Sequence, residues 1–143
     1  MGNRSTKSLS VILPENENRE DKIKSRVLDR LTRGGKQLSL RRFGFSDIPE
    51  CVFELDTHNI EVLDLSSNNS LKLTKRMEVF ENLTELNISC NTVDMVEFPI
   101  LPKLIKLDMS NITFQNGIFD ISCIPKSLEV LELSSSKYFL FKK

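Results

Sequence analysis

The sequence predicts an α/β repeat solenoid, an arc of about five coils with parallel strands on its concave face and an N-terminal capping helix. The first observation is a short Leu-x-Leu pattern that recurs at intervals of 21 to 25 residues. The second is that an apolar residue precedes most copies by three positions and another follows most of them by seven. The third is an amphipathic segment ahead of the first copy. The copies begin at Leu38, Leu63, Leu86, Leu107 and Leu131.

Each copy predicts one short strand followed by a bend. In Leu63-Asp64-Leu65 the alternation sends both leucines to one face and the aspartate to the other, so every unit has a buried face and a wet face. A single unit cannot bury its own apolar face, whereas stacked units form a continuous ladder of leucines. At the bend, Asn68 and Asn91 can hydrogen-bond to backbone groups that would otherwise be unpaired. The same position holds Phe43, Ile112 and Ser136 in the other copies, which leaves those bends less certain.

The full pattern, apolar-x-x-L-x-L-x-x-N-x-apolar, resembles the leucine-rich repeat family over residues 36 to 143. The returning segments around Pro49, Pro99 and Pro125 resemble the convex side of its shorter, cytosolic type, where proline excludes a long regular helix and favours irregular turns. The resemblance implies a non-enzymatic protein-protein interaction module or adaptor. It also permits two alternatives, a regulatory subunit or inhibitor of a signalling enzyme such as a phosphatase or small GTPase, and a fragment of a longer leucine-rich repeat receptor.

Residues 1–18 are predicted to form a flexible N-terminal arm with a lipidation site. Met1-Gly2-Asn3-Arg4-Ser5-Thr6 matches the N-myristoylation pattern, in which Gly2 carries the acyl chain. One myristoyl chain binds membranes only marginally, with a constant on the order of 10⁴ M⁻¹, so we expect weak membrane association unless a second signal contributes. Acidic residues from Glu15 onward oppose such a signal.

Residues 19–35 are predicted to form an amphipathic capping helix over the first coil. Asn18 can cap its start, and Gly34-Gly35 is predicted to end it. One helical face is apolar, and the alternative role for this face is to bind a partner or a membrane surface. Its members are Ile23, Val27, Leu28 and Leu31.

The C-terminal end of the predicted solenoid has no cap. After Leu133 the chain continues only to Lys143, without a helix or polar strand to cover the last coil. Uncovered ladder leucines would expose apolar surface and a strand edge. We therefore expect that the chain is a fragment of a longer solenoid or that another chain covers this end.

Length and composition predict one globular domain, and the lack of a secretory leader predicts a cytoplasmic location. The 143 residues are 39% hydrophobic, and Lys plus Arg and Asp plus Glu are equal at 20 each, which gives no charge-based argument for nucleic acid binding. The sequence lacks a secretory leader and any apolar run of the roughly 18–20 residues that a membrane span needs. Cys51, Cys90 and Cys123 are dispersed and are predicted to be reduced thiols.

The residue types do not combine into a catalytic or metal-binding constellation. His58 is the only histidine, and the carboxylates are spread along an open surface that cannot hold a substrate between an acid and a base. We expect no enzymatic activity, no cofactor, no metal and no small-molecule substrate.

The predicted binding surface is the concave face, where residues between and after the leucines point away from the core. Its most distinctive feature is an acidic stripe of Asp64, Asp108 and Glu132, suited to arginines or lysines of a protein partner. Arg41 and Arg42 place basic residues at its N-terminal edge. The candidate partner-binding residues are Arg41, Arg42, Asp64, Ser66, Glu85, Asn87, Lys106, Asp108 and Glu132.

Overall fold

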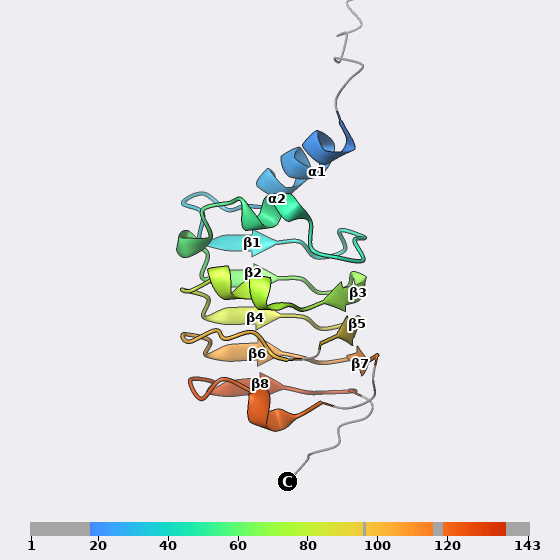
Figure 1. Cartoon of the computed structure of the whole chain (residues 1–143), viewed down its shortest axis with the longest axis vertical. Coiled ribbons are helices and arrows are strands. Elements are labelled where there is room, and N and C mark those ends of the chain that lie inside the picture. The colour runs from blue at the N-terminus through green and yellow to red at the C-terminus, as the bar shows by residue number, and fades with distance from the viewer. Residues whose placement is uncertain (1–17, 96, 116–118, 137–143) are drawn as a thin grey trace, which may run out of the picture.

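The computed structural model describes residues 18–95, 97–115 and 119–136. It is an α/β fold with two parallel sheets and few helices, which confirms the α/β class and the parallel strands that the sequence predicts. The larger sheet has the order β1 (Gln37–Ser39), β2 (Val62–Asp64), β4 (Glu85–Asn87), β6 (Lys106–Asp108) and β8 (Val130–Glu132). The smaller sheet has the order β3 (Asn69–Lys72), β5 (Asn91–Asp94) and β7 (Thr113–Phe114). Figure 1 shows the larger sheet's strands stacked along the long axis, with the smaller sheet beyond their carboxyl ends.

The register of the larger sheet follows the sequence motif. The first leucines of the five copies are Cα partners from β1 through to β8. In β1, β2, β4 and β6 these leucines are at most 1% exposed, and the apolar residue two positions later is fully buried. Each such burial contributes about 2 kcal/mol to stability. In β8 the corresponding Leu131 and Leu133 are only half-buried.

The segments that return from one strand to the next are short and irregular. They contain α2 (Glu50–Phe53) and the 3₁₀ helices η1 (Thr57–Asn59), η2 (Lys75–Val79) and η3 (Ile121–Cys123). Met77 and Phe80 are fully buried beneath this side. Proline stands directly before α2, where its missing amide costs no helical hydrogen bond. The expectation of irregular turns here is confirmed.

The N-terminal helix α1 (Arg19–Leu28) is shorter than the sequence predicted. Its N-cap is Asn18, whose side chain accepts from the Glu20 amide, but it ends at Leu28 rather than at Gly34-Gly35. Leu31 instead forms an antiparallel bridge with Leu38, so the chain after the helix pairs with the outer edge of β1. The unpaired backbone groups of that edge compete with further helical turns.

The apolar face of this segment is narrower than predicted as well. Val27 is fully buried and Ile23 and Leu31 are half-buried, but Leu28 is 47% exposed. Both glycines adopt positive φ angles, 85° at Gly34 and 69° at Gly35, in the turn that leads into β1.

Two buried asparagines stabilise the bends after the strands. Asn68 Oδ1 accepts from the amides of Phe43 and Gly44, at 2.9 and 3.0 Å. Asn91 Oδ1 accepts from the Asn68 amide at 2.9 Å. Each Nδ2 group donates to three backbone carbonyls, two in its own bend and one in the bend before it. The predicted role of these asparagines is confirmed.

The bend that holds Ser136 uses part of the same chemistry. Ser136 Oγ donates to the Met109 carbonyl at 2.6 Å and accepts from the Ile112 amide at 3.4 Å. A serine hydroxyl thus makes two of the contacts that an asparagine makes in the earlier bends.

The smaller sheet fixes the register of the chain after Asn69, which the repeat spacing alone leaves ambiguous because the second copy carries extra residues there. The second copy has one more residue at this point than the third copy, and Asn69 adopts a φ of 72° there. As a result, Leu71 rather than Ser70 pairs with Val93. Val93 in turn pairs with Phe114, and all three apolar side chains are buried. A left-handed residue can absorb such an insertion because it turns the chain without lengthening the strand.

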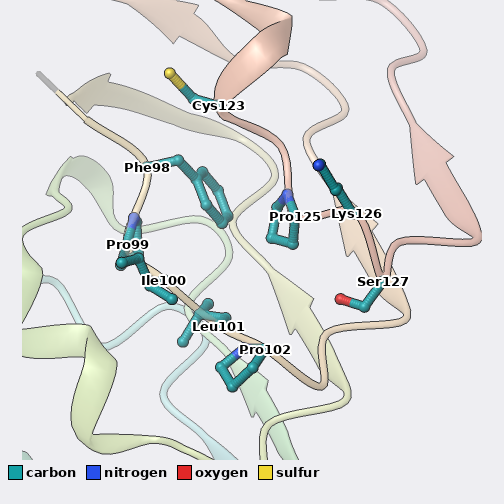
Figure 2. A pocket seen from close by; sticks show the side chains of 9 residues that line it. All are labelled: Phe98, Pro99, Ile100, Leu101, Pro102, Cys123, Pro125, Lys126 and Ser127. Atoms are coloured by element: carbon teal, nitrogen blue, oxygen red, sulfur yellow. The ribbon is translucent and has the colours of Figure 1, made fainter.

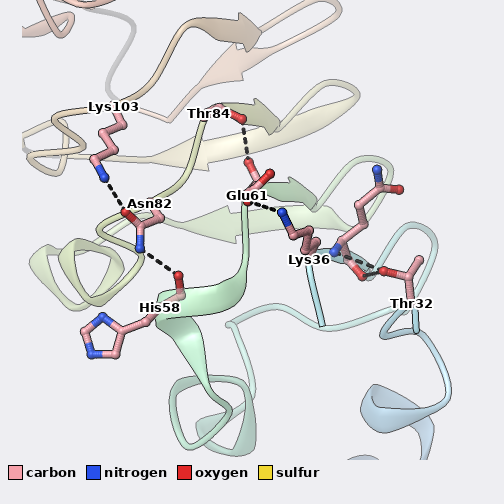
Figure 3. Close-up of polar contacts among 8 residues, drawn as sticks. Thr32, Lys36, His58, Glu61, Asn82, Thr84 and Lys103 are labelled. Carbon is pink, nitrogen blue, oxygen red and sulfur yellow. Dashed lines mark hydrogen bonds and ion pairs between the residues drawn. The ribbon is translucent and has the colours of Figure 1, made fainter. Parts of the chain in front are cut away.

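Side chains also link neighbouring turns at the amino ends of the strands (Figure 3). Asn82 Nδ2 donates to the His58 carbonyl at 2.8 Å, and Asn82 Oδ1 accepts from Lys103 Nζ at 2.5 Å. Thr84 Oγ1 donates to the Glu61 carbonyl at 3.0 Å. These contacts hold the amino ends of successive strands together.

Candidate protein-binding face

The strand face, defined as the outward side of the larger sheet, carries a row of polar residues at the centre of its strands. They are Ser39, Asp64, Asn87, Asp108 and Glu132, each the register partner of the next. Parallel strands lie about 4.8 Å apart, so these side chains form a line across the sheet. The predicted acidic stripe is therefore assembled in space, with Asn87 between the two aspartates.

Three members of the row are held by the bend that follows them. Asp64, Asn87 and Asp108 each accept, through Oδ1, a 2.9 Å hydrogen bond from the backbone amide two residues later. This side-chain turn limits the rotamers of the three residues. In the two aspartates it engages one carboxylate oxygen, and the other has no hydrogen-bond partner among the described residues. A partner would thus meet oriented acceptors.

A shallow depression of about 160 Å³ lies along this row. Asp64, Asn87 and Asp108 line it, together with Glu85 and Lys106 from the neighbouring position of the strands. Three carboxylates and one ammonium group give the depression a negative charge. Its size suits one side chain of a partner, not a whole small molecule.

Glu132 differs from the aspartates of the stripe. Its carboxylate lies 3.3 Å from Lys106 Nζ, and both side chains are nearly half exposed. An exposed ion pair of this kind contributes at most about 1 kcal/mol, so a partner could replace it. Asp64 and Asp108 are consequently the more available charges.

Ser66 does not belong to the accessible surface. It was predicted to face a partner, but it is only 3% exposed, and Ser89 at the same position of the next copy is 9% exposed. The Ser66 carbonyl accepts from the Arg42 amide at 3.1 Å and from Asn68 Nδ2 at 3.3 Å. Ser66 is therefore buried within the bend, where its carbonyl helps to join this bend to the bend before it.

Arg41 and Arg42 lie exposed in the bend after β1. Arg42 has a φ of 53°, and the residues at the same position of the other copies are also left-handed: Ser67, Cys90, Asn111 and Ser135. Arginine, serine and cysteine normally avoid this conformation, whereas asparagine tolerates it. The position is left-handed in all five bends because each of the first four residues donates its amide to the carbonyl of the next bend.

The returning side has a groove that the sequence did not indicate as a site (Figure 2). It encloses about 280 Å³ between the Phe98–Pro102 loop and the segment from Cys123 to Ser127. Ile100, 71% exposed, stands at its edge. The run of prolines and apolar residues in this loop could have indicated a surface groove. The same run also fits a turn buried against the core, and Leu101 is indeed only 1% exposed.

Other sequence expectations concern chemistry or segments away from this face. Gly2 and the residues after Ser136 lie outside the described residues. Within the described parts of the chain, no three His, Cys, Asp or Glu side chains come together as metal ligands would. Every helix in those parts is too short or too polar to cross a bilayer. The described thiols are free, with Cys90 and Cys123 exposed and Cys51 half-buried.

Comparison of the chain with protein-family models, with curated proteins and with solved structures finds no match.

Proposed function

We propose that the protein is a leucine-rich repeat solenoid that acts in the cytoplasm as a non-enzymatic adaptor and binds a protein partner on its concave strand face. Support for the repeat reading comes from the shared register of the five motif copies and from the left-handed residue at the same position of every bend. In such an architecture each unit contacts mainly its neighbours, and the strand side forms an extended binding surface.

One observation carries the choice of face. Asp64 and Asp108 are oriented by hydrogen bonds from the Ser66 and Ser110 amides, and flank Asn87 over the depression described above. Oriented carboxylates lose less side-chain entropy when they bind a guanidinium or ammonium group. The partner should therefore present at least one arginine or lysine to this row.

Asparagine is a suitable replacement for the two aspartates, because Asn87 occupies the equivalent position in the third copy and makes the same side-chain hydrogen bond. The double variant Asp64→Asn/Asp108→Asn removes two charges and keeps both turn hydrogen bonds. Proximity labelling in cells should lose a defined set of proteins from this variant. A purified member of that set should bind the wild-type chain at least tenfold more tightly than the variant.

The matched control is Asp47→Asn/Asp56→Asn, which removes two exposed aspartates away from the strand face. It should retain the full set of partners. If the strand-face variant captures the same proteins as wild type, the stripe is not the binding site.

We also propose that Gly2 is myristoylated and tethers the protein weakly to the cytosolic face of a membrane. Co-expression with an N-myristoyltransferase should add one myristoyl group to the intact mass, and Gly2→Ala should abolish the gain. An unchanged mass in the wild-type chain would refute the tether.

A further inference from the structure

A second groove lies at the N-terminal end of the molecule, between α1 and the bend after β1. It encloses about 270 Å³. Arg19, Lys22 and Arg26 line it from the helix, and Phe43 and Phe45 line it from the bend. The Arg26 guanidinium carbon lies 4.3 Å from the centre of the Phe43 ring. We call this the basic groove.

The charges of α1 are sorted between its two sides. Arg19, Lys22 and Arg26 are spaced three and four residues apart, so they lie on one helical face. Glu20 and Asp21 instead line a separate groove on the other side of the helix, next to Glu50 and Glu54 of the α2 region. Charges of both signs are mixed along the sequence of α1, but the folded helix presents Arg19, Lys22 and Arg26 to one groove and its two carboxylates to another.

The cations of the basic groove have no carboxylate partner within the part of the chain that the structure describes. Among the described residues, none of Arg19, Lys22 and Arg26 forms an ion pair, whereas Lys24 on the acidic side pairs with Glu54 at 3.2 Å. Asp29, the next carboxylate along the chain, is the C-cap of α1 and does not line the groove. The exposed Arg41 and Arg42 directly precede Phe43 and add positive charge at this end.

We propose that the basic groove is an electrostatic docking site for the anionic phospholipid headgroups of a membrane, and that it supplies the second signal required by a myristoylated Gly2. The proposal rests on the proposed acylation of Gly2 and is independent of the strand face. A single myristoyl chain attaches a protein only marginally, and a cluster of cations is one of the signals that make attachment stable. Each cation near an anionic leaflet contributes about fivefold to the partition coefficient.

A membrane fits these observations better than a soluble anion does. The groove begins at Arg19, and only the short arm from Gly2 separates it from the proposed acyl group. An arm of this length spans at most about 60 Å when fully extended, so an inserted acyl chain confines α1 to within that distance of the bilayer and raises its local concentration there. The half-buried Phe45 beside the cations offers an apolar contact at the depth of the headgroups.

The test uses the full acylated chain and vesicles of phosphatidylcholine, with and without phosphatidylserine. The variant Arg19→Ala/Lys22→Ala removes two exposed cations and leaves the Arg26 contact with Phe43 in place. Co-sedimentation should show a partition coefficient on phosphatidylserine vesicles lower by about 25-fold, with little change on phosphatidylcholine alone. High salt should remove the difference between wild type and variant.

The control variant Lys72→Ala/Lys126→Ala removes two exposed cations elsewhere and should change partition by less than about twofold. An equal loss in both variants would mean general charge attraction and would overturn the proposal. So would equal partition onto the two kinds of vesicle, or a wild-type chain that gains no myristoyl group. An unchanged denaturation midpoint in the groove variant confirms that its fold is intact.

A soluble anion is a separate outcome. If inorganic phosphate raises the thermal midpoint of wild type but not of the groove variant, while vesicle partition is equal for both, the groove binds a soluble phosphate and the membrane proposal is wrong. Failure of the adaptor proposal would look different, because Asp64→Asn/Asp108→Asn should partition onto vesicles like wild type.

Discussion

Asn91 Oδ1 accepts a 2.9 Å hydrogen bond from the backbone amide of Asn68. Asn68 is 1% exposed and Asn91 is 4% exposed, so the contact is sheltered from water. Asn68 makes the equivalent contact with the Phe43 amide. The two asparagines therefore join three consecutive bends through their side chains.

Replacing Asn68 should be among the most destabilising single changes. In Asn68→Ala the amides of Phe43 and Gly44 lose their acceptor, and three carbonyls lose a donor. Each buried group left unpaired costs about 1–3 kcal/mol, and water can reach some of them after the change. We expect the free energy of unfolding to fall by about 3 kcal/mol or more in urea titrations.

Two further variants serve as references for the effect of Asn68→Ala. Asn59→Ala removes an exposed asparagine and should change the free energy of unfolding by less than about 0.5 kcal/mol. Ser136→Ala removes two hydrogen bonds in a half-buried bend and should cost about 1 kcal/mol. Equal losses for Asn68→Ala and Asn59→Ala would contradict the role assigned to the buried amides.

Substitutions at the left-handed position of a bend should change the free energy of unfolding by amounts that depend on the side chain introduced. Cys90 is exposed and has a φ of 56°, so its side chain contributes little packing and the backbone angle dominates. Cys90→Asn should be neutral or slightly stabilising, because asparagine adopts this conformation readily. Cys90→Val should lower the free energy of unfolding by about 1–2 kcal/mol, because a β-branched side chain resists it. A valine variant as stable as wild type would show that the surrounding structure does not hold residue 90 at a positive φ angle.

The Glu50–Arg76 ion pair should make stability depend on pH. Arg76 Nη1 donates to Glu50 Oε2 at 2.6 Å, Nη2 donates to the other carboxylate oxygen, and the guanidinium lies 4.2 Å from the centre of the Phe53 ring. The hydrogen bonds from Arg76 hold the pKa of Glu50 below its ordinary value of 4.5 in the folded chain. The pair therefore stabilises the fold above about pH 4.5, and this stabilisation is lost as the pH falls through the folded pKa.

The variant Glu50→Gln tests this sign. Its unfolding free energy should lie below that of wild type near neutral pH, and the two curves should converge below the folded pKa of Glu50. The gap should be small, because both side chains are more than half exposed. A gap that widens toward acidic pH would contradict the assignment.

Cys51 should be the least reactive of the three thiols. Burial raises its pKa above the ordinary 9.0, and the nearby Glu54 carboxylate raises it further, so less thiolate is present at pH 8. Timed alkylation followed by peptide mass spectrometry should label Cys51 after the exposed Cys90 and Cys123. Glu54→Gln should accelerate labelling of Cys51 alone, and an unchanged rate would exclude the electrostatic contribution.

Local spacing predicted the strands well. Each strand of the larger sheet begins one residue before the first leucine of its copy, and the outward row is the one read from the sequence. A period of two residues decides which side chains share a face, and that property needs only near neighbours along the chain. The role of Asn68 and Asn91 followed in the same way, because polar side chains in a bend seek backbone partners nearby.

Predictions that depended on distant residues were less successful. The helix was predicted to reach Gly34-Gly35 but ends at Leu28, because the outer edge of β1 takes Leu31 as its partner. Ser66 was placed on the binding face but is buried by its neighbours in the stack. The register after Asn69 stayed ambiguous until the pairing of Leu71 with Val93 placed the extra residue.

The sequence by itself determined which residues form the strands of the larger sheet, which side chains of those strands share a face and where two of the bends need asparagine, because periodicity and hydrogen-bonding capacity are local properties. Only the tertiary structure decided how charges and cavities are distributed. It placed Arg19, Lys22 and Arg26 around the groove that Phe43 also lines, and it directed Glu20 and Asp21 to a different groove beside α1. The physical reason is that a groove and its electrostatic field are made by residues far apart in the chain, whose separation is known only after packing.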